Sequence, residues 1–205
     1  MALAALTSGA GAAAAATAEP RTILVLGDSL SAGYGVPMGR GWVDLLAADL
    51  ARRSPPLRVV NASVSGETTF GGLARLPALL DTHKPRLLVL ELGANDALRG
   101  TDLGIVHDNL ARLVALGRQA GARVLVLGMR IPPNYGPAYA EGFHALFARV
   151  ARGRGVGLVP FLLEDVARER RLFQDDGIHP TEAAQPRLLV RVLPALDRLL
   201  TSPAR

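Results

Sequence analysis

Five short runs of apolar residues recur along the chain, and each is bounded by Gly, Pro, Asn or a charged residue. They occupy residues 22–26, 57–61, 87–91, 123–128 and 156–159. Short runs rich in Val, Ile and Leu are typical of strands that are buried on both faces of a parallel sheet. The pattern therefore predicts a core of five strands.

Between these runs, apolar residues recur at intervals of three and four, which is the spacing of an amphipathic helix. The helical stretches are residues 41–53, 72–80, 103–120, 139–152 and 181–200. Thr181 is the expected N-cap of the last one, and we expect Trp42 and the leucines of these stretches in the core. Alternating strands and helices form right-handed βαβ units, so the chain is predicted to be an α/β protein with helices on both faces of a parallel sheet.

The length of the chain suits a single domain. With 205 residues and 49% hydrophobic content, residues 19–205 suffice for one full-sized domain. Residues 1–18 are nearly all Ala, Gly, Leu, Ser and Thr, and they end in Ala16-Thr17-Ala18. This ending fits the cleavage pattern of a signal peptide, although no Lys or Arg precedes the apolar stretch. We interpret residues 1–18 as a signal peptide or a disordered tail, and expect a periplasmic or secreted protein, with a cytoplasmic one as the alternative.

Composition and charge exclude several classes of protein. The chain has no cysteine, which excludes disulfides and thiolate chemistry, and no run of 18 apolar residues lies after residue 18. The net charge of +5 would suit nucleic-acid binding, but the arginines are scattered and aromatic residues are only 4%. We therefore expect neither nucleic-acid binding nor stable insertion in a membrane.

Polar residues follow the predicted strands at the points where they end. Gly27-Asp28-Ser29 follows the first strand, and Ser29 suits either a helix cap or a nucleophile. Gly66 lies in the segment after the second strand, and Asn95 lies directly after the third. The carboxyl ends of parallel strands meet at one edge of the sheet, where ligands bind. There, the backbone N–H groups of Ser29 and Gly66 and the side-chain amide of Asn95 can stabilise an oxyanion.

A serine nucleophile also needs a base and a carboxylate that orients the base. Among the four histidines, His179 lies in a loop before the last helix. The other three fall in helical stretches or in a surface loop at the amino end of the third strand: His107, His144 and His83. Asp176 precedes His179 by three residues, so that a turn can bring its carboxylate onto the imidazole Nδ1, and Asp175 is the alternative carboxylate.

Together these segments resemble the SGNH hydrolase superfamily, the GDSL esterases and lipases. The family is named for four residues that fall here on Ser29, Gly66, Asn95 and His179. Residues 27–34, 60–63, 72–77, 131–136 and 175–180 are similar to the bacterial branch that contains acyl-CoA thioesterase I, lysophospholipase L1 and arylesterase. The resemblance extends from about residue 23 to residue 186, which is most of the predicted domain.

The resemblance implies a three-layer α/β/α flavodoxin-like sandwich with strand order 2-1-3-4-5. It implies a catalytic triad that Asp176 completes, and the use of neither a metal nor a cofactor. It further implies that Leu98, in a mobile loop, and the segment with Ile131 and Tyr135 line an acyl-binding site. The expected partner is a small-molecule acyl ester or thioester, hydrolysed through an acyl-enzyme, and the expected state is a monomer or a weak oligomer.

Two other functions stay open at this point. A carbohydrate acetylesterase of the same superfamily would have a short, polar acyl site instead of an apolar one. A flavodoxin-like binding module without catalysis would need a phosphate-binding loop, but the chain contains neither Gly-x-x-x-x-Gly-Lys-Ser/Thr nor Gly-x-Gly-x-x-Gly.

Overall fold

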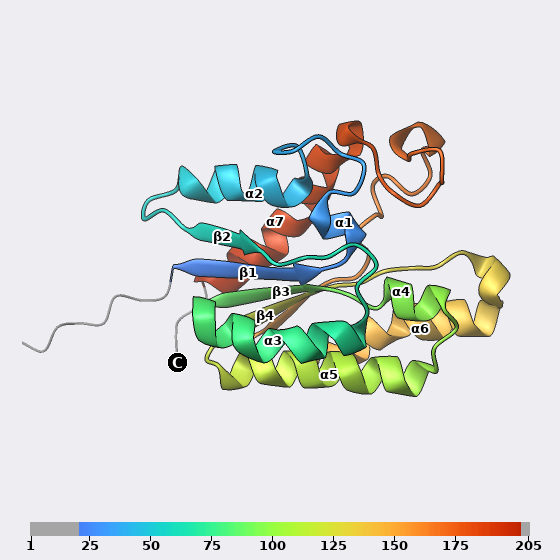
Figure 1. Cartoon of the computed structure of the whole chain (residues 1–205), viewed down its shortest axis with the longest axis horizontal. Helices are drawn as coiled ribbons and strands as arrows, with labels where there is room; N and C mark the ends of the chain where they lie inside the picture. The colour runs from blue at the N-terminus through green and yellow to red at the C-terminus, as the bar shows by residue number, and fades with distance from the viewer. Residues whose placement is uncertain (1–20, 202–205) are drawn as a thin grey trace, which may run out of the picture.

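A five-stranded parallel sheet forms the centre of the protein (Figure 1). The computed structural model describes residues 21–201, so the predicted signal peptide lies outside the described residues. The sheet order is β2-β1-β3-β4-β5, as expected. The strands are β1 (Thr22–Gly27), β2 (Arg58–Asn61), β3 (Leu87–Glu91), β4 (Arg123–Leu127) and β5 (Val156–Val159).

Helices cover both faces of the sheet and make the predicted three-layer sandwich. Helices α2 and α7 pack together on one face, and α3, α5 and α6 pack on the other (Figure 1). The helices are α1 (Ser29–Ala32), α2 (Trp42–Ala51), α3 (Thr69–His83), α4 (Ala94–Leu98), α5 (Leu103–Gln119), α6 (Pro137–Val150) and α7 (Gln185–Thr201). Three short 3₁₀ helices join them: η1 (Pro133–Tyr135), η2 (Arg170–Leu172) and η3 (Glu182–Ala184).

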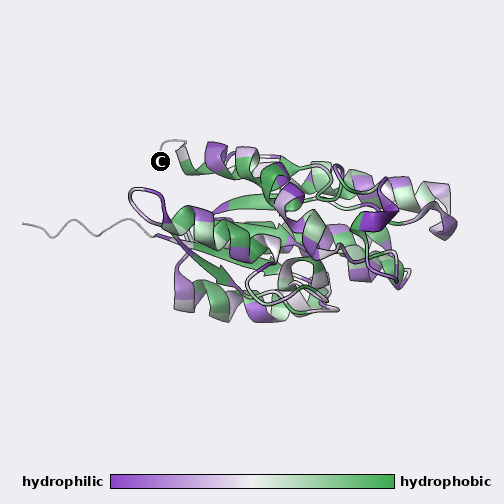
Figure 2. Ribbon diagram, turned by 90° about the horizontal axis from the view of Figure 1, so that it is seen from above, coloured by the Kyte–Doolittle hydropathy of each residue, from purple (hydrophilic) through white to green (hydrophobic). Residues whose placement is uncertain are grey.

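The core lies where the sheet meets the helices. Apolar residues are concentrated in the strands, and polar ones lie mainly on the outer surfaces of the helices (Figure 2). Every residue of β3 is buried, and Trp42 and Leu46 of α2 are fully buried against the sheet. The interpretation of Trp42 as a core residue is confirmed, as is that of most of the leucines, whereas Leu45 is only partly buried.

Three local predictions were wrong. Helix α3 begins three residues before the predicted start, because the Thr68 side chain caps it by accepting a hydrogen bond from the Gly71 N–H. His83 is the last residue of that helix and not part of a loop. Thr181 precedes η3 and makes no capping bond through its side chain, so α7 begins only at Gln185.

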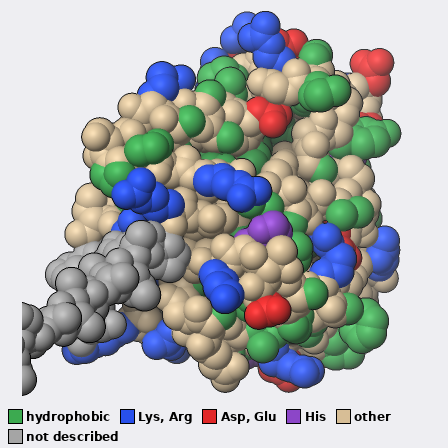
Figure 3. Space-filling model, turned by 60° about the vertical axis from the view of Figure 1, so that its left-hand side comes forward, with side chains coloured by type: hydrophobic (Ala, Val, Ile, Leu, Met, Phe, Trp, Pro, Cys, Tyr) green, Lys and Arg blue, Asp and Glu red, His purple; other side chains and the backbone are tan. Residues whose placement is uncertain are grey.

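The surface charge agrees with the scatter of arginines in the sequence. Figure 3 brings the left-hand side of Figure 1 forward, and its Lys and Arg side chains lie apart from one another, with acidic side chains among them. The part of this face that the grey segment leaves visible therefore shows no continuous basic stripe of the kind that is typical of nucleic-acid binding. Within residues 21–201, no helix has both the length and the apolar character needed to cross a membrane.

Candidate active site

Ser29 is the first residue of α1, directly after β1 ends. The cap of this helix is Asp28, whose Oδ1 accepts a hydrogen bond from the Leu30 N–H at 3.0 Å. After one turn, Gly33 ends the helix in the left-handed region, at a φ of 75° that favours glycine. The Ser29 hydroxyl is therefore not used as a cap and is held at the carboxyl edge of the sheet.

The Ser29 hydroxyl meets His179, which comes from the loop before η3. The distance from Oγ to the imidazole Nε2 is 2.9 Å. On the other side of the ring, Nδ1 lies 2.7 Å from Oδ2 of Asp176. The structure thus brings together the three residues that the sequence singled out, although 150 positions separate the serine from the histidine.

The Asp176 carboxylate determines which imidazole nitrogen carries the proton. Its pKa is lowered to about 2, chiefly by the backbone N–H of His179 and then by the imidazole and the Ile178 N–H. Asp176 is therefore ionised at neutral pH, so Nδ1 donates to it and Nε2 is left to accept the Ser29 hydroxyl proton. Asp175 takes part through its backbone carbonyl, which accepts a hydrogen bond from Arg170.

Hydrogen bonds within the loop hold Asp176 and His179 in place. Gly177 has a φ of 71° and closes a turn by donating its N–H to the Gln174 carbonyl. The Arg170 guanidinium donates to the carbonyls of three successive residues, 173–175. The Gln174 side-chain amide donates to the Tyr34 carbonyl and so ties the loop to the segment after α1. The loop therefore needs no ligand to orient its acid and its base.

Two backbone N–H groups beside Ser29 are free to bind an anion. Within residues 21–201, neither the Ser29 N–H nor the Gly66 N–H has a hydrogen-bond acceptor. Gly66 has a φ of 79°, which favours glycine, and nothing lies within 4 Å of the position of a Cβ on it. These two groups suit an oxyanion that forms on a substrate bound at Ser29.

The Asn95 side chain lies next to both of these segments. Its Nδ2 donates to Oδ2 of Asp28 and to the carbonyl of Glu67, each at 3.0 Å. Both amide hydrogens therefore have acceptors in the structure described. Asn95 can donate to an oxyanion only if it shares or releases one of these two hydrogen bonds.

A comparison with known protein families shows to which family the chain belongs. A sequence model of the GDSL-like lipase/acylhydrolase family matches residues 25–186. The chain belongs to this family. The match includes Ser29, Gly66, Asn95, Asp176 and His179, so the geometry above lies wholly within the matched segment.

Similar proteins support the same assignment. The GDSL-family chain is 51% identical to "Esterase TesA" of Pseudomonas aeruginosa over 89% of its own length and 91% of the relative. It is 44% identical to "Thioesterase 1/protease 1/lysophospholipase L1" of Escherichia coli, over 80% and 78% of the two chains. The crystal structure of the esterase EstA from Pseudoalteromonas sp., inhibited by monoethylphosphonate, superposes with a TM-score of 0.83 at 38% identity and covers 89% of this chain and 100% of that one. The family, the fold and the hydrolase class that the sequence predicts are confirmed.

The three predicted acyl-site residues lie on two segments of this GDSL-family chain. Leu98 is partly buried at the end of α4, Ile131 is buried after β4, and Tyr135 is exposed in η1. The Tyr139 hydroxyl donates to the Thr101 carbonyl at 2.6 Å and so connects the α4–α5 loop to α6. No hydrogen bond or ring contact joins Leu98, Ile131 or Tyr135 to the triad within residues 21–201, so their role stays a prediction.

Two residues at the site were not found from the sequence. The Tyr34 ring packs on His179 with 4.5 Å between ring centroids. Asp96 accepts hydrogen bonds from the Thr69 hydroxyl and N–H, at 2.6 and 2.9 Å, and so joins the start of α3 to α4. Asp96 thereby fixes the Gly66 segment relative to Asn95. A signal for Asp96 was present, because it directly follows Asn95 in the polar segment after β3.

The other three histidines lie away from Ser29. His107 contacts Asp108 on α5, His144 contacts the Met129 carbonyl, and His83 ends α3 near the amino end of β3. Among the described residues, no three His, Asp or Glu side chains group as ligands for a metal ion.

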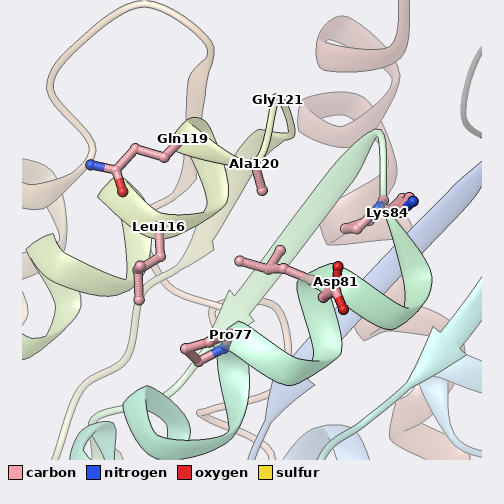
Figure 4. Close-up of a pocket in the computed structure, with 9 residues that line it drawn as sticks. Pro77, Asp81, Lys84, Leu116, Gln119, Ala120 and Gly121 are labelled. Carbon is pink, nitrogen blue, oxygen red and sulfur yellow. The ribbon is translucent and has the colours of Figure 1, made fainter.

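A separate cavity of about 550 Å³ lies at the opposite edge of the sheet, between α3 and α5 (Figure 4). It is lined by Pro77, Leu80, Asp81, Lys84, Pro85, Leu116, Gln119, Ala120 and Gly121. None of these residues belongs to the predicted site, so the cavity is distinct from the site at Ser29.

Proposed function

We propose that this chain is a serine hydrolase that cleaves carboxylic esters and thioesters of medium to long acyl chains through an acyl-enzyme on Ser29. The observation that carries the proposal is the continuous hydrogen-bonded relay from Asp176 through His179 to the Ser29 hydroxyl. A serine is a poor nucleophile until an adjacent base takes its proton, and this relay supplies that base.

The relay accounts for both halves of the reaction. His179 Nε2 takes the hydroxyl proton while Ser29 Oγ attacks the acyl carbonyl carbon. The protonated imidazole then gives this proton to the departing alcohol or thiol, which leaves the acyl group on Ser29. In the second half, His179 removes a proton from a water molecule that attacks the acyl-enzyme, and returns it to Ser29 as the acid is released.

The negative charge on the tetrahedral intermediate requires donors that are already in place. The free N–H groups of Ser29 and Gly66 are two such donors, and the Asn95 amide is the third. When the oxyanion forms, it competes for an Asn95 N–H with the Glu67 carbonyl. A charged oxygen is a stronger acceptor than a neutral carbonyl, so the hydrogen bond from Asn95 to the substrate oxygen is stronger in the transition state than in the ground state.

Replacing Asn95 by alanine should lower kcat by about 10²–10³, because loss of one oxyanion donor costs about 2.7–4 kcal/mol. Steady-state hydrolysis of a p-nitrophenyl ester measures the effect, and a thermal melt checks the fold. Gln119→Ala, which removes a side-chain amide at the opposite edge of the sheet, is the matched control and should keep wild-type kcat. An Asn95→Ala enzyme with unchanged kcat would remove Asn95 from the oxyanion hole.

The names of the relatives support the substrate class. They include an esterase and a thioesterase that is also named lysophospholipase. The buried Ile131 and the partly buried Leu98 support an apolar acyl site, whereas a carbohydrate acetylesterase would need a short, polar one. We place arylesterase, thioesterase and lysophospholipase substrates within the range of this one site.

The direct test is a substrate series on one purified sample. We expect a fluorophosphonate probe to label Ser29, and p-nitrophenyl esters and acyl-CoA thioesters of medium to long chains to be hydrolysed faster than acetyl compounds. Faster turnover of acetylated carbohydrate would favour the acetylesterase. A sample that resists the probe and hydrolyses none of these substrates would favour the binding module.

We place the active enzyme in the periplasm or outside the cell. The support is the composition of residues 1–18 and their Ala16-Thr17-Ala18 ending, which lie outside the described residues. We also propose that it acts as a monomer or a weak oligomer on a small-molecule substrate.

A further inference from the structure

Glu91 is a buried acid next to residues 27–31, the segment that carries Ser29, and it has no role in the mechanism described above. It ends β3, where it pairs in register with Gly27 of β1, and its exposed fraction is 0%. A buried carboxyl group is costly unless it is neutral or well paired. Its position directly below residues 27–31 therefore requires an explanation.

The Glu91 carboxyl contacts three of the five residues in the segment that carries Ser29. Its Oε2 accepts hydrogen bonds from the Asp28 N–H at 3.2 Å and from the Ser31 hydroxyl at 2.7 Å. A Cβ on Gly27 would lie 2.8 Å from the same oxygen, which is too close for any side chain. Gly27, Asp28 and Ser31 are thus arranged around this one carboxyl oxygen.

Glu91 also faces a second buried carboxyl, that of Asp28. Asp28 receives one donor on each oxygen: the Leu30 N–H on Oδ1 and the Asn95 amide on Oδ2. Glu91 receives both of its donors on Oε2, while Oε1 is buried and has no hydrogen-bond partner among the residues described. Two adjacent buried carboxyls do not both ionise, and the side chains of Asp28 and Glu91 are also hydrogen-bonded to each other, which requires a proton on one of them. The pattern matches an ionised Asp28 whose carboxylate accepts this hydrogen bond from a protonated Glu91.

Electrostatics agree with this assignment. Burial, followed by the charge of Asp28, raises the pKa of Glu91 well above its usual range. Burial raises the pKa of Asp28 to about 6, which still leaves it ionised at neutral pH. Of the other titratable groups that act on the pair, Asp96 raises the pKa of Asp28 and His179 lowers it.

We propose that Glu91 works as a neutral carboxylic acid and is a positioning residue, which holds the Asp28 carboxylate in place and, through it, the Asn95 amide and the Ser29 turn. This role rests on the proposed function, since it serves the same oxyanion and nucleophile. Ionisation of Glu91 would put a second negative charge beside Asp28. The repulsion would displace the Asp28 carboxylate, which accepts a hydrogen bond from the Asn95 amide. Because the pKa of Glu91 is raised, its neutral carboxyl favours folding most in acid, and this contribution is lost as the pH rises through the pKa of Glu91 in the folded state.

Two replacements of Glu91 separate its charge from its shape. Glu91→Gln keeps a neutral, hydrogen-bonding group of the same size, so kcat at pH 7 should stay within about threefold of wild type. The variant should also stay active at alkaline pH where wild type declines. Glu91→Ala should lower kcat by about 10–100-fold with little change in KM, because the Asp28–Asn95 geometry relaxes.

The control is Leu90→Ala, on the same strand and equally buried, which should lower thermal stability without moving the pH profile. Infrared spectroscopy gives a readout that does not depend on catalysis. Wild type at neutral pH should show the carbonyl band of a protonated carboxylic acid, and Glu91→Gln should lack it.

Three results would overturn the inference: Glu91→Gln as impaired as Glu91→Ala, an alkaline limb that is the same in Glu91→Gln and wild type, or no carboxylic-acid band in wild type. A Glu91→Ala chain that fails to fold leaves the other two measurements to decide. Failure of the proposed function looks different, because Ser29 would then resist the fluorophosphonate probe in every variant, including wild type.

Discussion

Ser29→Ala should abolish ester hydrolysis, with kcat lowered by about 10⁴–10⁶. The loss is this large because the Oγ atom is the attacking group, and within residues 21–201 it is the only hydroxyl hydrogen-bonded to Nε2 of His179, at 2.9 Å. The backbone N–H groups at positions 29 and 66 remain, so the variant should still bind substrate with KM near the wild-type value. Burst-phase and steady-state kinetics with a p-nitrophenyl ester measure the change.

A second serine provides the control for this experiment. Ser54 lies between α2 and β2, at the edge of the sheet opposite Ser29, so the Ser54→Ala variant should keep full activity. Both variants should melt at nearly the wild-type temperature, since neither removes a core side chain. A Ser29→Ala enzyme that kept near wild-type turnover would rule out the acyl-enzyme mechanism.

The next largest effect is expected at the carboxylate. Asp176→Asn should lower kcat by about 10³–10⁴, because an amide beside Nδ1 favours the tautomer whose Nε2 is protonated and cannot accept from Ser29. Asp175→Asn should change kcat by less than about threefold, since its part in the loop is a backbone carbonyl that the substitution retains. The reverse order of the two variants would assign the role to Asp175.

The pKa of Asp176 adds a pH test to the same pair of variants. Because its pKa is lowered to about 2, the carboxylate stays ionised through the mildly acidic range. Its contribution to folding is therefore present above the ordinary aspartate pKa of 3.8 and is lost as the pH falls toward 2. Between about pH 4 and pH 2 the free energy of unfolding of wild type should accordingly fall more steeply than that of Asp176→Asn, where no such group titrates.

Most of the fold was predictable because strands buried on both faces leave a continuous apolar record in the sequence. Helices of ten residues or more were recognised by their periodicity. Helices α1 and α4 have four and five residues and so are too short to show a period. The start of α3 depends on a hydrogen bond that the Thr68 side chain accepts, and the start of α7 depends on the 3₁₀ turn that precedes it, where Thr181 makes no side-chain capping bond. Neither feature shows in a hydrophobic pattern.

At the candidate site, the residues that carry chemistry were predictable because their types are restricted by the reaction. The residues that hold them in place were not, because their partners are distant in sequence. Glu91 contacts Asp28 and Ser31 across 63 and 60 positions, and Asp96 contacts Thr69 across 27. Arg170 donates hydrogen bonds to backbone carbonyl groups, and because every residue has one, the sequence does not reveal these partners. The sequence held two signals for these supporting residues: the acid Glu91 within the otherwise apolar run 87–92, and the position of Asp96 directly after Asn95.

The described chain begins and ends at the edge of the sheet opposite Ser29 (Figure 1). Arg86 fastens the last turn of α7 there by donating to the Leu200 carbonyl, just ahead of the start of β3. A surface linker or a fused carrier domain joined next to residue 21 or residue 201 would therefore lie at the edge of the sheet away from Ser29. Attachment at these two described positions suits immobilisation on a solid phase, because the edge of the sheet that carries Ser29 then faces away from the support.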